Sequence, residues 1–234
     1  MFIRVINRFF KLFRYRVIPL TVFTLACEAL HRRGNCITFI QVGANDGVRY
    51  DDLFQKVTGG GWKGLVIEPI PETFERLAMN YRHNQNVIPL NFAIHPDKSS
   101  EKVFYVSPDA LMLYPDYAYG LGSMMRGHLV KHGINDSDIS VVDVPCRTLS
   151  KVIAEHDLHD LDVLQIDTEG FDYEVIKTLD FEASKPLIVK FEWMNLSAEE
   201  KQAARQLLLG HGYNVFVERG GADCVAILAG SLNL

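Results

Sequence analysis

The sequence predicts an α/β protein with a doubly wound, mostly parallel sheet and one antiparallel strand near its carboxyl end. Short apolar runs alternate with helical patterns from residue 36 to residue 209, and this order is typical of parallel strands joined by helices. The last two apolar runs, 213–217 and 224–229, are joined through Gly220 and Gly221, which favours a hairpin. The 234 residues suffice to bury a full core.

The expected elements follow in chain order. Apolar runs predict strands at residues 36–42, 63–68, 87–94, 161–167 and 187–193. Helical patterns occupy residues 50–57, 71–81, 148–155, 170–179 and 196–209. Pro71, Thr148 and Ser197 each suit the start of a helix, whereas Gly59–Gly61 suits a flexible turn. Two further strand-like runs cover residues 101–106 and 141–145. Residues 107–133 show neither a helical nor a strand period of apolar residues. A loop of this length in a compact domain is usually functional.

Charge and cysteine usage exclude some classes of protein. The net charge of −5 argues against a nucleic-acid binder with an extended basic face. No C-x-x-C pair occurs among Cys27, Cys36, Cys146 and Cys224, so a zinc site is not expected. Apolar neighbours predict buried free thiols in a reducing compartment, and hence a cytoplasmic location.

The first 34 residues differ from the remainder, residues 35–234, which form the predicted domain. They carry seven basic residues and one acidic residue in a helical, Phe-rich pattern. Charges interrupt each apolar run well before ~20 residues, so we expect no spanning helix. Two interpretations remain open. The extension is a helix that packs on the domain or on a second copy of the chain, or residues 1–20 lie on the inner membrane face as a basic amphipathic helix.

A glycine-bounded turn, Gly43-Ala44-Asn45-Asp46-Gly47, follows the first predicted strand. Backbone amides in such a turn, and at the start of the next helix, can face a ligand. The dinucleotide pattern G-x-G-x-x-G is absent, because Asn45 and Val48 stand where it needs glycine. This favours a nucleoside ligand without phosphates. The alternatives are an ordinary strand-to-helix turn and a nicotinamide-dinucleotide site in an oxidoreductase.

Polar residues also mark the carboxyl ends of the other predicted strands. Glu68 lies about 20 residues beyond the turn, where a carboxylate can accept hydrogen bonds from both hydroxyls of a ribose. A solvated acid at a strand end is the alternative. The ends of the third, fourth and fifth strands carry Asn91 and Ala93, Asp167 and Glu169, and Glu192. Because parallel strands end at one edge of a sheet, these residues predict an adenosine site.

Four segments, VGANDG, VIEP, NFAI and IDTEGFDYEVI, resemble the FkbM family of S-adenosylmethionine-dependent methyltransferases over about residues 36–195. The resemblance implies a Rossmann-like seven-stranded methyltransferase sheet. It also implies O-methylation of a sugar, glycan or natural-product-like acceptor, with S-adenosylmethionine as cofactor. The family often has Asp where this chain has Gln41, so one charge near the cofactor is missing. A methyltransferase fold used only as a binding module is a further alternative.

The resemblance also implies roles for individual residues. The methionine tail of the cofactor would lie against Gln41, Gly43, Ala44, Asn45, Asp46 and Gly47. Glu68 would bind the ribose, with Pro69 and Ile70 near the adenine and Asn91 and Ala93 flanking it. Ser123 would close over the tail, and Asp167 would lie beside the sulfonium.

Methylation of a hydroxyl requires that its proton be removed, and the candidate catalytic residues are Asp167, Glu169, Glu192 and His128. Asp167 and Glu192 could share a proton or bind a divalent cation, with Glu169 or Asp172 as a third ligand. Plainer alternatives are a structural His128, a Glu192 paired with Lys190 or Arg76, and an Asp172 on a solvated helix face. An aromatic platform for a sugar ring, or simple packing, would explain Trp193, Tyr114, Tyr117 and Tyr119.

Overall fold

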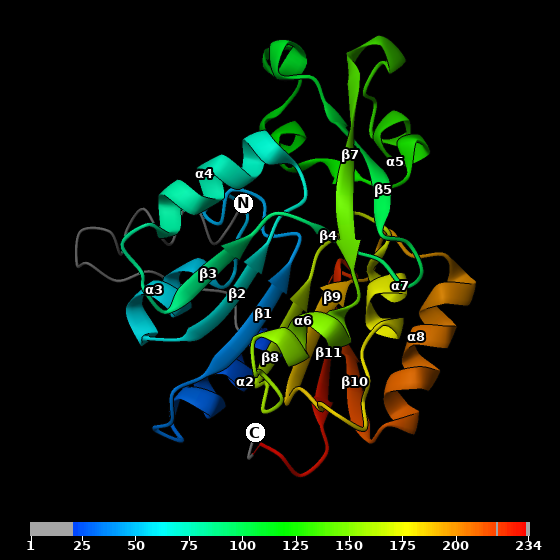
Figure 1. Ribbon diagram of the computed structural model, residues 1–234. Helices are drawn as coiled ribbons and strands as arrows, with labels where there is room; N and C mark the ends of the chain where they lie inside the picture. Colours follow the sequence, from blue (N-terminus) through cyan, green and yellow to red (C-terminus); the bar gives the residue numbers. More distant parts are fainter. Residues whose placement is uncertain (1–20, 219, 233–234) are drawn as a thin grey trace, which may run out of the picture.

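The computed structural model describes residues 21–218 and 220–232 and shows an α/β fold built on a seven-stranded sheet (Figure 1). The strand order is β10-β11-β9-β8-β1-β2-β3. All neighbours pair in parallel except β11, which runs antiparallel to both β9 and β10. The predicted sheet is thereby confirmed. Its strands are β1 (Thr38–Val42), β2 (Lys63–Ile67), β3 (Val87–Leu90), β8 (Val163–Ile166), β9 (Ile188–Glu192), β10 (Tyr213–Val217) and β11 (Asp223–Leu228).

Helices cover both faces of this sheet because alternate strand residues point to opposite sides. On β1, Ile40 belongs to the core shared with α6 (Leu149–Glu155), α7 (Asp172–Lys177) and α8 (Ala198–Gly210). Its neighbour Phe39 belongs to the core shared with α2 (Val22–His31), α3 (Phe54–Gly60) and α4 (Pro71–Tyr81). Two apolar layers therefore hold the sheet between two layers of helices.

The helix starts confirm the capping residues expected from the sequence. Thr148 accepts a hydrogen bond from Lys151 N–H, and Ser197 forms a capping box with Glu200. The helix expected at residues 50–57 instead spans Phe54–Gly60, and Asp51 Oδ1 accepts the N–H groups of Leu53 and Phe54 just before it. This helix ends on Gly61 in the left-handed region (φ 67°), so the two preceding glycines are helical and do not form a flexible turn.

A second sheet, not predicted from the sequence, stands at the carboxyl ends of the main strands (Figure 1). Its order is β4-β7-β5-β6, with bounds β4 (Ala93–Ile94), β5 (Ser100–Val106), β6 (Gly122–Ser123) and β7 (Ile139–Arg147). The single third strand expected at 87–94 is wrong. Asn91 instead donates hydrogen bonds to two backbone carbonyls beside β2, and the chain leaves the main sheet there, so Ala93 pairs with Cys146 on β7.

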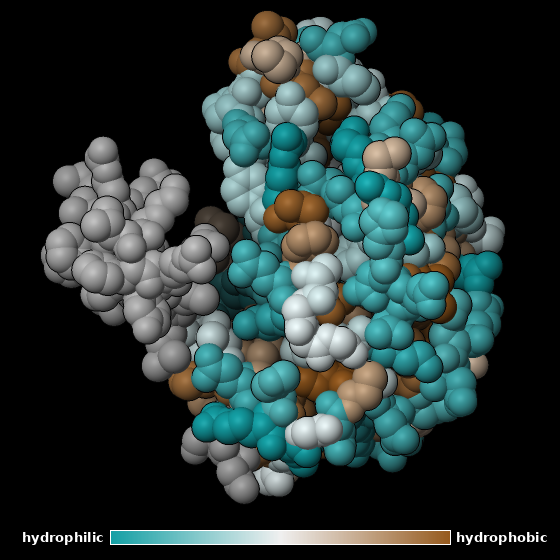
Figure 2. Space-filling view, turned by 90° about the vertical axis from the view of Figure 1, so that its left-hand side faces the viewer, coloured by the Kyte–Doolittle hydropathy of each residue, from teal (hydrophilic) through white to brown (hydrophobic). Residues whose placement is uncertain are grey.

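Residues 107–133 are ordered, although their sequence has no clear period. They form two short 3₁₀ helices (Pro108–Leu113 and Asp116–Gly120), β6 and α5 (Arg126–Lys131) around a small apolar core. Met112 and Leu113 remain 84% and 75% exposed. In Figure 2 apolar side chains gather at the top of the molecule, where this region lies in Figure 1. We call residues 107–133 the cover segment, because they lie over the carboxyl edge of the main sheet.

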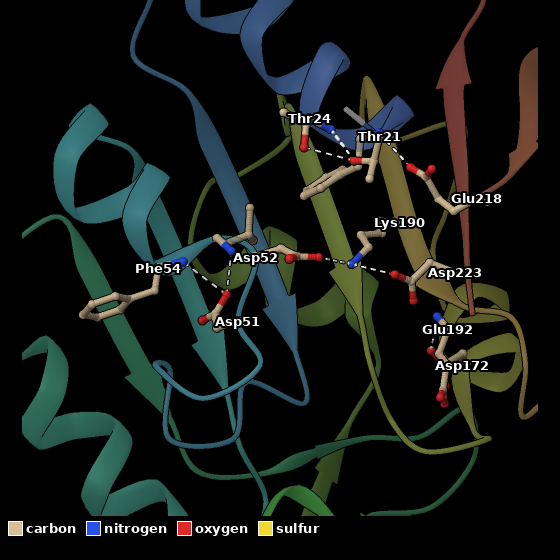
Figure 3. Close-up of polar contacts among 12 residues, drawn as sticks. Thr21, Thr24, Asp51, Asp52, Phe54, Asp172, Lys190, Glu192, Glu218 and Asp223 are labelled. Carbon is tan, nitrogen blue, oxygen red and sulfur yellow. Dashed lines mark hydrogen bonds and ion pairs between the residues drawn. The ribbon is translucent and has the colours of Figure 1, made fainter. Parts of the chain in front are cut away.

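The amino-terminal part of the chain joins the core through α2. Phe23 and Leu30 are each 2% exposed, and Phe23 N–H donates to Glu218 (3.0 Å; Figure 3). Residues 1–20, for which the sequence left a packed helix and a basic membrane-surface helix open, lie outside the described residues. Across the part of the chain that the structure describes, no helix is both long and apolar enough to cross a membrane.

The cysteines are free thiols, as the sequence predicts. Cys27, Cys146 and Cys224 are buried, but Cys36 is exposed, so its expected burial is wrong. Cys36 lies just before β1, outside the layers of helices that cover the main sheet.

Candidate functional site

The glycine turn after β1 is held tightly between β2 and β8. The N–H groups of Gly43 and Ala44 both donate to the carbonyl of Ile67 (3.0 Å each). Gly43 has φ 76°, and a Cβ atom there would lie 1.8 Å from the carbonyl oxygen of Asp167. Glycine is therefore required at position 43 by both the backbone angle and the close approach of the chain. Asn45 also has a positive φ (49°), which keeps the turn compact.

Glu68 links this turn to the segment after β2. Its side chain is buried, with Oε2 accepting Asn45 N–H (3.0 Å) and Oε1 accepting Ile70 N–H (2.9 Å). Burial raises the pKa of Glu68 to about 7, against the two stabilising backbone hydrogen bonds. Glu68 is therefore a fixed part of the site and not a solvated acid. Each oxygen keeps a lone pair for a ligand hydroxyl.

A cavity of about 240 Å³ opens beside Glu68, between the edge of the main sheet and the second sheet. Mostly apolar walls surround it, including Ile70, Phe92 and Tyr105. The sequence-predicted residues that line it are Gly43, Asn45, Glu68, Pro69, Ile70, Ala93, Ser123 and Asp167. Asn91 is not among the lining residues, because its amide is bonded to the carbonyls of Glu68 and Pro69 (2.8 and 3.0 Å). Asn91 therefore holds the backbone of two residues that line the cavity, Glu68 and Pro69, without lining it itself.

A second cavity, of about 140 Å³, adjoins the first at the ends of β1 and β8. Gln41 and Gln165 lie opposite each other in the strand register and border this cavity. The Oε1 atom of each is buried and has no hydrogen-bond partner among the described residues. Two buried acceptors without donors fit a ligand that carries N–H groups. The remaining lining residues include Gly43, Ala44, Asn45, Asp167 and Glu169.

Besides Asn91, two of the predicted cofactor residues, Asp46 and Gly47, border neither cavity. Asp46 Oδ1 accepts the N–H groups of Val48 and Arg49 (2.9 and 2.8 Å), which stabilises the turn. A Cβ atom on Gly47 would lie 2.7 Å from the side chains of Leu77 and Tyr81. Asp46 and Gly47 thus position the turn without lining the cavities.

Several carboxylates meet at the ends of β8 and β9. Asp167 borders both cavities, and desolvation and then Glu169, Asp172 and Glu192 raise its pKa well above the usual range. Glu192 accepts a hydrogen bond from Asn195 Nδ2 (2.8 Å), while its Oε2 is buried with no partner among the described residues. Burial, followed by repulsion from Glu169, raises the pKa of Glu192 to about 8. Asp167 and Glu192 therefore hold their protons to higher pH than exposed carboxyl groups do.

Asp172 and Lys190 have structural roles that differ from the alternatives considered from the sequence. Asp172 is fully buried and accepts hydrogen bonds from Thr168 Oγ1 (2.9 Å) and Glu192 N–H (3.0 Å), so a solvated face is wrong (Figure 3). Burial raises its pKa to about 6. Lys190 lies between Asp52 and Asp223 and does not pair with Glu192 (Figure 3).

The cover segment contributes His128 to this edge. His128 Nε2 lies 2.8 Å from Glu169 Oε2, and the imidazole is buried. Ser123 Oγ donates to the carbonyl of Glu169 (3.0 Å) and accepts Met125 N–H (3.1 Å). Glu169 itself has φ 53°, a conformation that non-glycine residues rarely adopt outside functional or tightly held positions. These contacts join the cover segment to the end of β8.

Sequence reasoning missed three residues of the site. Gln165 is the polar residue inside an apolar strand, which is a visible signal. Asn195 bonds to both Glu169 and Glu192 (3.2 and 2.8 Å), but an asparagine three residues after a strand-end acid carries no distinctive pattern. His132 lies near His128 and Glu169, and its spacing of four residues from His128 would have indicated a shared helix face.

A family model for the methyltransferase FkbM domain matches residues 41–215, which is more than half of the chain. The chain belongs to the FkbM methyltransferase family. The match begins at Gln41 and includes every strand of the main sheet from β2 to β9. No curated protein sequence matches the chain.

Solved structures show the same fold at low identity. An FkbM methyltransferase from Methylobacillus flagellatus KT has a TM-score of 0.50 and 11% identity, covering 82% of this chain and 43% of its own. A METTL16 methyltransferase domain has a TM-score of 0.49 and 11% identity, covering 87% and 64%. The N-terminal domain of human METTL16 in complex with SAH has a TM-score of 0.43 and 12% identity, covering 90% and 71%. The chain thus spans less than two thirds of the first two.

FkbM membership supports a methyltransferase and implies S-adenosylmethionine as its cofactor, and the residues present fit that molecule. The larger cavity offers apolar walls for an adenine and the Glu68 carboxylate for ribose hydroxyls. The smaller cavity offers the unpartnered oxygens of Gln41 and Gln165, which suit an ammonium group. Asp167 lies where the two cavities meet, so a ligand occupying both would pass beside it.

Proposed function

We propose that this FkbM-family protein is an O-methyltransferase that transfers the methyl group of S-adenosylmethionine to a hydroxyl of a sugar, glycan or natural-product-like acceptor. The position of Asp167 supports this proposal most directly. It borders both cavities at the carboxyl end of β8, among Glu169 and Glu192. An alcohol is a poor nucleophile until its proton is removed, and a carboxylate beside the reacting centre can accept that proton.

Each part of the site has a defined task in this proposal. Glu68 holds the ribose, while Ile70 and Phe92 enclose the adenine and keep water out. Gln41 and Gln165 accept hydrogen bonds from the amino group of the methionine tail. The bound human METTL16 neighbour carries S-adenosylhomocysteine, the product of such a transfer, and we extend that ligand class to this chain.

The chemical step needs little from the protein beyond alignment and proton removal. When bound, the cofactor supplies a methyl group on a positively charged sulfur, which is already an activated leaving group. The acceptor oxygen forms a new bond to this methyl carbon as the carbon–sulfur bond breaks. Asp167 accepts the hydroxyl proton, and its raised pKa makes the ionised carboxylate a stronger base than an exposed one.

A methyl-transfer screen tests the proposal. Purified protein, S-adenosylmethionine and panels of glycans and small alcohols should give an acceptor whose mass increases by one methyl group, with the methyl on oxygen. Asp167→Asn should lower kcat by roughly 100-fold or more, with S-adenosylhomocysteine still bound. Asp180→Asn, an exposed change outside both cavities, is the matched control.

Three outcomes would contradict this assignment. Methylation on nitrogen or on a carboxylate would show a different reaction. S-adenosylhomocysteine binding without transfer to any acceptor would favour the binding-module alternative. Tight NAD binding in calorimetry without S-adenosylhomocysteine binding would favour an oxidoreductase.

A further inference from the structure

Two histidines of the cover segment and one carboxylate after β8 converge outside the larger cavity. One potential ligand atom from each of His128, His132 and Glu169 lies within 4.8 Å of the other two. His128 and His132 are four residues apart at the end of α5, which places both rings on one side of that helix. The ring centroids are 4.5 Å apart. Asp167 and Glu192, the metal ligands considered from the sequence, belong to no such group of three within the described residues.

The spacing of these atoms is close to that around a bound metal ion. Ligands at ~2.0–2.2 Å from a tetrahedral ion lie about 3.4 Å from one another. His128 Nε2 and Glu169 Oε2 are 2.8 Å apart, and the His132 atom is within 4.8 Å of both. The three side chains would have to shift to reach one ion, because these distances range from below to above the spacing of about 3.4 Å.

The surroundings hold these ligands as outer partners hold them in metal centres. Asn195 Nδ2 donates to Glu169 Oε2 (3.2 Å), and Tyr117 donates to the backbone carbonyl of His132 (3.1 Å). The positive φ of Glu169 and the Ser123 hydrogen bond to its carbonyl hold the backbone at this position. Of these contacts, the bond from Asn195 acts on a ligand side chain, as the outer partners of metal ligands do.

We propose that His128, His132 and Glu169 form a binding site for a first-row divalent transition metal ion, with Zn²⁺ and Mn²⁺ as the leading candidates. Two imidazoles and one carboxylate suit such ions, whereas Mg²⁺ and Ca²⁺ prefer oxygen ligands alone. Three protein ligands leave coordination positions open for water or for an oxygen of another molecule. Of the three, Glu169 also borders the smaller cavity, which Asp167 borders as well, so the site adjoins the proposed reacting centre.

A catalytic consequence follows, and it rests on the proposed O-methyl transfer. An acceptor hydroxyl that occupies an open position on the ion would have a lower pKa, because the cation stabilises the alkoxide. Its proton would pass to Asp167, its oxygen would bond to the methyl carbon, and the carbon–sulfur bond would break. Metal binding itself depends on none of these steps and can be tested without them.

The test uses the full chain, freed of metal with a chelator and dialysed against Zn²⁺, Mn²⁺ or Co²⁺. We expect one equivalent bound per chain, visible d–d absorption for the Co²⁺ form, and a higher Tm with metal. Loss of a ligand in His132→Ala should weaken binding by at least about 100-fold, more than the loss of an outer partner usually does. The control is His83→Ala, which removes an exposed histidine just after α4. It should bind the metal with the same affinity as the unchanged protein.

Two further arms separate the possible outcomes. His132→Asn keeps a polar side chain and tests whether any loss reflects folding, which the metal-free Tm reports. No stoichiometric metal, or equal binding by His132→Ala, would overturn the site and leave a hydrogen-bonded His–Glu pair. If metal binds and methyl transfer survives chelation, the catalytic consequence is overturned. If metal binds and no acceptor is methylated, the proposed function fails while the site stands.

Discussion

Replacement of Glu68 is the sharpest test of the cofactor site, because one side chain supports both the glycine turn and the ligand. Its two oxygens accept the N–H groups of Asn45 and Ile70 in a buried position. Glu68→Gln keeps one acceptor oxygen and replaces the other with a donor, which cannot accept a backbone N–H. Glu68→Ala removes both acceptors.

The expected magnitudes follow from these contacts. Each buried donor left without a partner costs ~1–3 kcal/mol, and Glu68→Ala leaves two, so it should lower the free energy of unfolding by roughly 2–6 kcal/mol. A hydrogen bond from a ribose hydroxyl to a carboxylate contributes ~1.5–3 kcal/mol. Loss of one such hydrogen bond should therefore raise the Kd for S-adenosylhomocysteine by between about 10-fold and about 150-fold, and loss of both should raise it further.

Calorimetric titration with S-adenosylhomocysteine measures the change in affinity, and urea unfolding measures the change in stability. Glu75→Gln, an exposed change on α4 outside both cavities, is the matched control and should leave both quantities unaltered. The reasoning would be refuted if Glu68→Gln were folded and bound S-adenosylhomocysteine with an unchanged Kd. In that case Glu68 would support the turn and would not contact the ribose.

Three further predictions concern the framework of the site. Gly43→Ala should unfold the turn or abolish S-adenosylhomocysteine binding in calorimetry, because the added Cβ atom would meet a backbone carbonyl. The control is Gly61→Ala, which has a similar φ but open space around the added atom. It should lower the free energy of unfolding in urea by only ~1 kcal/mol. Asp172→Asn should lower the free energy of unfolding by about 2–4 kcal/mol, because the amide has one acceptor oxygen for the N–H groups of Thr168 and Glu192 and the Thr168 hydroxyl. Glu174→Gln on the same helix is the control and should change this free energy by less than ~1 kcal/mol. Raising the pH from 5 to 8 should lower the Tm in thermal unfolding. The buried carboxyl of Glu68 has a pKa of about 7 in the folded protein, against 4.5 in the unfolded chain. The folded state therefore binds more protons between these two values, and its stability falls as the pH rises through them.

Each of these predictions has a clear failure. Equal behaviour of the two glycine variants would show that the turn adapts. Equal losses for the two α7 variants would show that burial at the helix start contributes little. A Tm that rises between pH 5 and pH 8 would mean that other groups outweigh Glu68 in proton linkage. An unchanged slope in Glu68→Gln would show that Glu68 does not contribute to it.

The sequence determined the main sheet because its signals are local. Apolar runs of strand length, Pro71, Thr148 and Ser197 act within a few residues, and the alternation of elements leaves few topologies for a parallel sheet. The same logic located the candidate site, since the acid or amide after each strand lies at the carboxyl edge. Glu68 and Asp167 were therefore predictable as neighbours before any contact was seen.

The sequence could not predict contacts between segments distant along the chain. The cover segment carries no period, yet it brings His128 to Glu169, 41 residues later, and closes the cavities. Asn195 bridges two acids for the same reason. Asp172 looked like one more acid on a helix, and only its burial against the end of β9 revealed a structural role.

The sequence by itself determined the parallel sheet, its family and the edge at which the cofactor is expected. Tertiary structure alone decided the second sheet, the cavities, the carboxylate cluster and the meeting of His128, His132 and Glu169. The physical reason is the range of the interactions. Propensity, capping and periodicity depend on residues within one or two turns of each other, whereas burial, pKa shifts and ligand geometry depend on what the fold brings together.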